Sequence, residues 1–182
     1  WEHLKPVFID INPDTLCIDP EKIEAAITPN TRAILAVHVF GYPCDVEKIE
    51  AIALKHDLKV VYDAAHAFGA TYNSRSLLDY GDVSTCSFHA TKLFHTIEGG
   101  CVIAHDGEVT EKLELIKRFG HQGDDHIMLG INWKMSEFNA AMGLSVLPYF
   151  EEIVSARKVI SSLYDSLIDG RLVRPVVPSN FT

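Results

Sequence analysis

The sequence lacks several features that would mark particular classes of protein. Its four cysteines include no C-x-x-C pair, and three of them stand inside apolar runs, which favours buried reduced thiols over a disulfide framework. No apolar stretch reaches the length of a membrane span, and the first residues lack the basic-then-apolar pattern of a signal peptide. A formal net charge of -9 repels phosphate backbones on average. We therefore expect a soluble, cytoplasmic protein with no membrane and no nucleic-acid partner.

The sequence also lacks an initiator methionine and begins at Trp1. It stops at Thr182, shortly after a stretch that contains prolines. We interpret both ends as cuts through a longer protein. The 182 residues, with 47% hydrophobic and 23% charged residues, have the composition of an ordinary globular domain. We predict a large domain over residues 1–170 that lacks its N-terminal part. Residues 171–182 are predicted to be a linker towards a missing C-terminal small domain.

Apolar segments alternate with amphipathic ones along the chain. Two of the amphipathic segments follow an Asp that can cap a helix, namely Asp19 and Asp45. The predicted strands cover residues 6–11, 31–38, 58–63, 83–88 and 100–104, and the predicted helices cover residues 21–27, 46–56, 108–118, 136–149 and 152–167. This alternation predicts an α/β protein with a mainly parallel sheet and helices on both faces, in three layers.

Polar residues stand at the ends of three predicted strands that are otherwise apolar. They are His38, Asp63 and Ser87, and Lys92 follows Ser87 after a short loop. Each alone has a structural interpretation, as a hydrogen-bonded His, a helix-capping Asp or a solvated Lys. Ligands of open parallel sheets bind beyond the carboxyl ends of the strands. An acid, a hydroxyl and a lysine at one such edge therefore favour a functional site.

These three groups match the needs of pyridoxal phosphate (PLP). A lysine amine condenses with the aldehyde of the cofactor if its pKa is low enough to supply neutral amine. A carboxylate that faces the pyridine nitrogen keeps it protonated, so that the ring accepts electrons from a carbanion. Hydroxyl and backbone N–H groups bind the phosphate. We therefore predict a PLP enzyme in which Lys92 is the Schiff-base lysine.

Four motifs that occur in order along the chain are more specific than any single residue. They are Val61-Tyr-Asp-Ala-Ala-His-Ala-Phe-Gly69, Ser87-Phe-His-Ala-Thr-Lys92, Glu98-Gly-Gly100 and Gly130-Ile-Asn-Trp-Lys-Met-Ser-Glu137. With these motifs, the chain resembles the DegT-type sugar aminotransferases, a family of fold-type I PLP enzymes, from about Pro6 to Pro175. The resemblance implies an aminotransferase that transfers an amino group from glutamate or glutamine to a nucleotide-linked keto-sugar.

The resemblance also implies a role for each matching residue. Lys92 and Asp63 match the lysine and the acid just described, and His66 falls where the family has Gln or His close to the cofactor ring. Ser87 matches a phosphate-binding hydroxyl. Asn132 matches an Asn that reaches the cofactor phosphate of the neighbouring subunit, which implies a homodimer with a shared active site.

The chain departs from the family pattern in several places. Tyr62 replaces a residue that is often Glu, and Lys134 stands where Arg is usual, so that a bidentate anion contact there would become a single-point one. The N-terminal Gly-Thr phosphate contacts, the ring-stacking aromatic residue and the small domain of the family have no counterpart. We therefore expect the chain by itself to be inactive.

Three alternatives compete with the aminotransferase. A sugar dehydratase of the same fold uses the pyridoxamine form of the cofactor, but the dehydratases that resemble this chain have His at the lysine position, so Lys92 favours transamination. A metal-dependent hydrolase would use His38, Asp63, His66, His89 and His95, which lack compact ligand spacing. A non-catalytic regulator of this fold usually loses the lysine or the acid, and both are present here.

Overall fold

The chain folds into two compact units in the computed structural model, which describes residues 3–168, 170 and 172–182. Unit 1 comprises the described residues up to Cys86 together with those from Ile168 onwards, and unit 2 comprises Ser87–Leu167. Residue 1, at the predicted N-terminal cut, and residue 171, at the start of the predicted linker, lie outside the described residues. The division of the chain into a large domain and a linker stays a prediction.

Unit 1 is built on parallel strands. β1 (Ala33–Val37) pairs with β2 (Lys59–Asp63), and β2 pairs with β5 (Val83–Ser87). The register places Asp63 opposite Val37 on one side and Thr85 on the other. The predicted α/β class with a mainly parallel sheet is confirmed. Asp63 is the last residue of its strand, as the sequence indicated.

The core of unit 1 lies between one face of these strands and helix α2 (Val46–His56). The Asp45 carboxylate caps this helix by accepting the Lys48 N–H at 3.2 Å. Alternate strand residues belong to the same buried cluster as the apolar face of the helix. The cluster includes Ile34, Ala36, Val46, Ile49, Ala53, Val60 and Tyr62. Asp19 caps the short η1 (Pro20–Lys22) that leads into α1 (Ile23–Ala26), as its position before Pro20 predicted.

Residues 6–11 do not form the predicted strand. The structure has only an isolated antiparallel bridge between Ile11 and Ile18 there, and Phe8 is 91% exposed. A strand needs a neighbouring strand to pair with its N–H and C=O groups, and apolar composition alone does not supply one.

Short elements complete unit 1. They are η2 (Val39–Gly41), the antiparallel pair β3 (Thr71–Tyr72) and β4 (Arg75–Ser76), and η3 (Leu77–Asp79). The end of the chain returns to this unit, because Thr71 and Thr182 each donate their N–H to the C=O of the other, at 2.8 and 2.9 Å.

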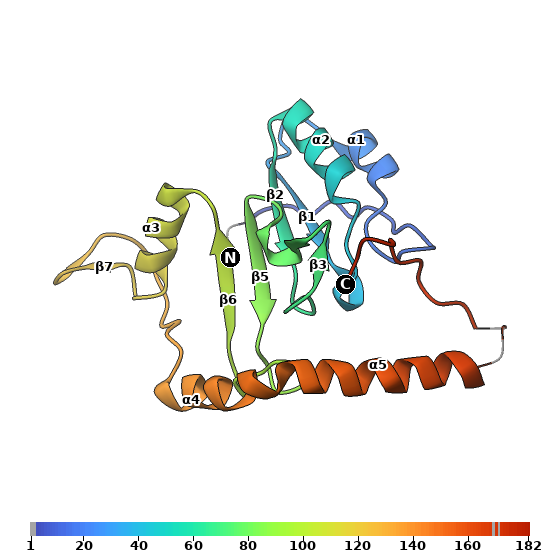
Figure 1. The fold of residues 1–182 in the computed structure, drawn as a ribbon. Helices are drawn as coiled ribbons and strands as arrows, with labels where there is room; N and C mark the ends of the chain where they lie inside the picture. The colour runs from blue at the N-terminus through green and yellow to red at the C-terminus, as the bar shows by residue number, and fades with distance from the viewer. Residues whose placement is uncertain (1–2, 169, 171) are drawn as a thin grey trace. The chain divides into compact units, whose positions relative to one another are not determined.

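Unit 2 contains the later helices and strands of the chain, which are coloured from green to orange in Figure 1. It consists of β6 (Gly100–Ala104), α3 (Gly107–Ile116), the hairpin of β7 (His121–Gln122) and β8 (Asp125–His126), α4 (Glu137–Val146), η4 (Leu147–Tyr149) and α5 (Phe150–Leu167). The predicted helices are confirmed as α3, α4 with η4, and α5. Within the described part of the chain, no helix is both long and apolar enough to cross a membrane.

Candidate active site

The end of β2 presents the Asp63 side chain, which is half-buried. One carboxylate oxygen, Oδ1, accepts the N–H of Ala65 at 3.0 Å, and the Asp63 main-chain carbonyl accepts the N–H of His38 at 2.9 Å. The carboxylate is therefore oriented by the turn that follows the strand. A half-buried, oriented carboxylate at a strand end can pair with a cationic ring nitrogen of a ligand.

The turn after Asp63 carries His66, whose side chain is exposed. Ala64 and Ala67 are fully buried on either side of it, and the Ala67 N–H donates to the Ala64 carbonyl at 2.9 Å. Gly41 packs against this turn so closely that a Cβ there would lie 2.6 Å from the His66 carbonyl oxygen. Gly41 also has a φ of +85°, a left-handed conformation that only glycine adopts without strain. The close approach and the left-handed backbone both require glycine at position 41, where the chain packs against the His66 turn.

His38, which directly follows β1, is only 1% exposed and serves the fold. Its Nδ1 accepts the Cys44 N–H at 3.1 Å, so the neutral ring carries its proton on Nε2, and the ring stacks on Tyr62 with centroids 4.5 Å apart. Burial lowers the pKa of His38 from 6.5 to about 4, against the attraction of the nearby Asp63 carboxylate. Its Nε2 has no hydrogen-bond partner among the described residues.

Unit 2 begins with Ser87 and carries Lys92 in the loop that follows, and both side chains are half-buried. Ser87 Oγ accepts the His89 N–H at 3.3 Å, and the Lys92 N–H donates to the His89 carbonyl at 2.9 Å. The His89 ring also bonds to the Thr91 hydroxyl at 2.9 Å. The loop is thus a bonded turn that holds the lysine backbone in a defined conformation.

Asn132 lies in the exposed loop before α4, where its Oδ1 accepts a hydrogen bond from Lys134 Nζ. The Lys134 ammonium also lies over the Phe119 ring, 4.5 Å from its centroid. Lys134, the departure from the family Arg, therefore has partners within its own unit. The Asn132 Oδ1 is occupied by Lys134, whereas its amide N–H groups can serve as donors to a ligand.

Asn139, on α4, is a polar residue that the sequence analysis did not select. Its Nδ2 donates to the carbonyls of Thr96 and Glu98 at 2.6 and 2.9 Å, at the far end of the Lys92 loop. The signal in the sequence was an Asn inside an apolar helical run, between Phe138 and Ala140. Such a residue needs a partner if it faces the interior, but spacing alone does not identify the partner.

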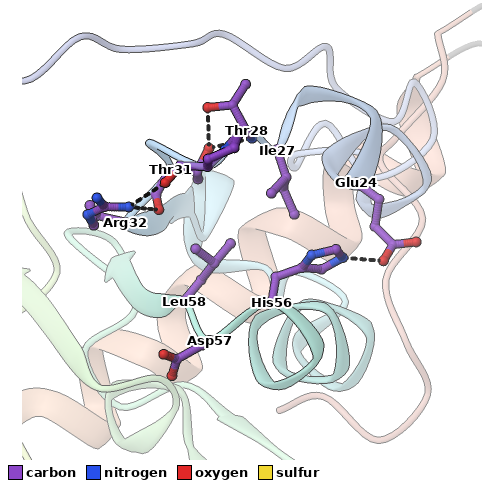
Figure 2. A pocket seen from close by; sticks show the side chains of 9 residues that line it. Glu24, Ile27, Thr28, Thr31, Arg32, His56, Asp57 and Leu58 are labelled. Atoms are coloured by element: carbon purple, nitrogen blue, oxygen red, sulfur yellow. Dashed lines mark hydrogen bonds and ion pairs between the residues drawn. The ribbon is translucent and has the colours of Figure 1, made fainter.

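A hollow of about 580 Å³ in unit 1 lies elsewhere, at the amino end of β1 (Figure 2). Its lining is Glu24, Ile27, Thr28, Pro29, Thr31, Arg32, His56, Asp57 and Leu58. The polar groups there already bond to one another: His56 Nε2 lies 2.7 Å from Glu24 Oε1, and Arg32 Nη1 donates to the Pro29 carbonyl at 2.8 Å. Since ligands of parallel sheets bind at the opposite edge, we do not assign the chemistry to this hollow.

Metal-ligating side chains do not gather in the part of the chain that the structure describes. No group of three or more His, Cys, Asp and Glu side chains there could hold a metal ion. None of the four cysteines, all of which the structure describes, forms a disulfide, and Cys17, Cys44 and Cys86 are buried.

The fold of the chain is that of aminotransferases of known structure. DesV of S. venezuelae, solved in complex with a ketimine intermediate, matches it with a TM-score of 0.88 and 32% sequence identity, over 97% of this chain and 49% of that chain. The chain belongs to the DegT/DnrJ/EryC1/StrS aminotransferase family, whose model matches residues 1–178. The predicted family is confirmed, and its aminotransferases are PLP enzymes.

Two curated relatives carry the same name. A dTDP-4-amino-4,6-dideoxy-D-glucose transaminase of Shigella dysenteriae is 48% identical over 178 residues, which cover 97% of this chain and 48% of that protein. The transaminase of that name from Escherichia coli is 42% identical over 184 residues, covering 99% of this chain and 49% of that protein. The chain spans about half the length of the curated relatives it matches.

Proposed function

We propose that the protein transfers an amino group, with PLP as cofactor, from an amino-acid donor such as glutamate or glutamine to the keto group of a nucleotide-linked sugar. The single observation that carries this proposal is Lys92, half-buried in a bonded loop directly after a strand of a family aminotransferase. The names of the relatives, which are transaminases of dTDP-linked sugars, support the substrate class.

The residues of this chain fit the cofactor by the chemistry of their side chains. Lys92 would supply the amine that bonds the cofactor, Asp63 would hold a proton on the pyridine nitrogen, and Ser87 would donate to the phosphate. His66 is exposed on the turn after Asp63 and would lie close to the cofactor ring. When bound, the cofactor supplies an electron sink for the carbanion that amino transfer generates.

We also propose a homodimer in which Asn132 donates to a phosphate oxygen in the site of the partner subunit. The loop around Asn132 and the start of α4 support this, because they expose apolar side chains that water solvates poorly. Trp133 is 51% exposed, Met135 42% and Phe138 90%. The predicted large domain and linker belong to the same proposal, as parts of one longer enzyme.

The test is to reduce the complete protein with borohydride in the presence of PLP and to map the pyridoxyl adduct by mass spectrometry. We expect a yellow protein with the adduct on Lys92, and a Lys92→Ala protein without that adduct. An adduct on another lysine would reject the assignment of Lys92. Glutamate and a keto-sugar nucleotide should then give an amino-sugar product, whereas loss of water from the sugar would favour the dehydratase.

A further inference from the structure

The loop that carries Lys92 is closed on itself by main-chain hydrogen bonds within unit 2. The Phe88 N–H donates to the Gly99 carbonyl at 2.8 Å, and the Thr96 N–H donates to the Phe88 carbonyl at 2.9 Å. Phe94 and Thr96 are buried at the base of the loop, with 8% and 3% of their surface exposed. Contacts that fix the base of the loop therefore also determine the position of Lys92.

Asn139 of α4 holds the base from outside the loop. Its amide nitrogen has two N–H groups, and it donates to two carbonyls, those of Thr96 and Glu98. Its Oδ1 lies against the hydroxyl of Ser136, which also accepts the Asn139 N–H at 3.2 Å. The side chain is thus fixed at its own helix start and bonded to residues more than forty positions earlier.

A second contact from the same helix lies one turn later. At Gly143, an added Cβ would lie 2.8 Å from the Thr96 methyl carbon Cγ2 and 3.4 Å from Phe94 Cζ. The helix backbone therefore approaches the loop base as closely as a glycine permits. Figure 1 shows α4 beside the start of β6, where the loop ends. The hydrogen bonds of Asn139 and the close packing at Gly143 thus both contact the base of the Lys92 loop.

We propose that Asn139 is a positioning residue for Lys92: it bonds the base of the loop to α4 and so holds the lysine in the conformation that captures the cofactor. The inference rests on the proposed function, because it assigns Lys92 to the cofactor. Asn139 acts through the main chain of residues 96–98, which distinguishes it from the residues that would contact PLP.

The experiment compares Asn139→Ala with the unaltered complete protein, first without cofactor. Hydrogen exchange of peptides covering residues 88–99 should accelerate about 30-fold, because the two Asn139 hydrogen bonds that hold the base of the loop to α4 are lost. The PLP concentration for half-maximal borohydride capture on Lys92 should rise about tenfold. Ser145→Ala is the matched control, since its hydroxyl bonds to the Ala141 carbonyl of the same helix. It should change neither measurement.

Gly143→Ala is a second test if Asn139→Ala does not fold, because it should affect exchange in the loop without weakening the helix. Alanine favours the helix, so α4 amides should exchange no faster, while the added methyl group displaces the loop base and residues 88–99 exchange faster. Unchanged loop exchange in Asn139→Ala, or faster exchange with unaltered capture of PLP, would overturn the inference and leave the proposed function intact. If the unaltered protein captures no cofactor at Lys92, the proposed function fails, and this role fails with it.

Discussion

Acid should destabilise the fold through His38, whose ring is buried and neutral. In an unfolded chain a histidine has a pKa of about 6.5, so below that pH the unfolded state binds a proton that the folded state refuses until about pH 4. The contribution of His38 to stability is therefore fully present above pH 6.5 and is lost as the pH falls through the window towards 4.

The magnitude follows from these two pKa values. At about pH 5, the proton should favour the unfolded state by about 2 kcal/mol relative to its effect at about pH 7.5. No discount for solvent screening is needed, because the side chain is only 1% exposed. Since ordinary domains are stable by only about 5–15 kcal/mol, the loss is measurable.

The assay is urea unfolding of the cofactor-free protein, followed by circular dichroism at both pH values. The matched variant is His38→Asn, in which the amide oxygen can accept the Cys44 N–H as Nδ1 does but cannot take up a proton. Other groups titrate equally in the two proteins, so their contributions cancel. The unaltered protein should lose about 2 kcal/mol more than the variant between the two pH values. Equal losses in the two proteins would refute the reasoning.

Three further predictions concern the proposed site and the turn beside it. Asp63→Asn should retain the fold and some bound PLP but lose most turnover, because the ring nitrogen loses the acid that keeps it protonated; near-normal rates would return Asp63 to a structural role. Asn132→Ala should weaken PLP binding about ten- to a hundredfold, and mixing it with Lys92→Ala chains should restore activity above either parent if sites are shared. No recovery in proven mixed dimers of two defective parents would reject sharing. Gly41→Ala should lower the free energy of unfolding by at least about 1–2 kcal/mol, because of its left-handed backbone and its 2.6 Å approach to a carbonyl, whereas Gly107→Ala, with open space around its Cβ, should not. Equal stabilities in urea would contradict this.

Much of the local structure follows from short patterns in the sequence. Asp45 caps α2 as its position predicted, and apolar residues at helical spacing mark the buried face of that helix, because both effects act within a few residues. Residues 6–11 show the limit of such patterns. Their apolar composition suits a strand, but pairing depends on a distant partner, and the structure has only the bridge at Ile11.

For the candidate site too, the sequence determined some features and the tertiary structure determined others. The sequence by itself determined which residue types stand at the strand ends, and the motifs around Asp63 and Lys92 placed the chain in its family. Only the tertiary structure decided that His38 is buried, neutral and bonded to Cys44, and that Asn139 reaches the base of the Lys92 loop. Burial and long-range hydrogen bonds depend on which segments meet in space. The order of residues in the sequence does not say which distant segments will be neighbours, because the packing of the whole fold decides this.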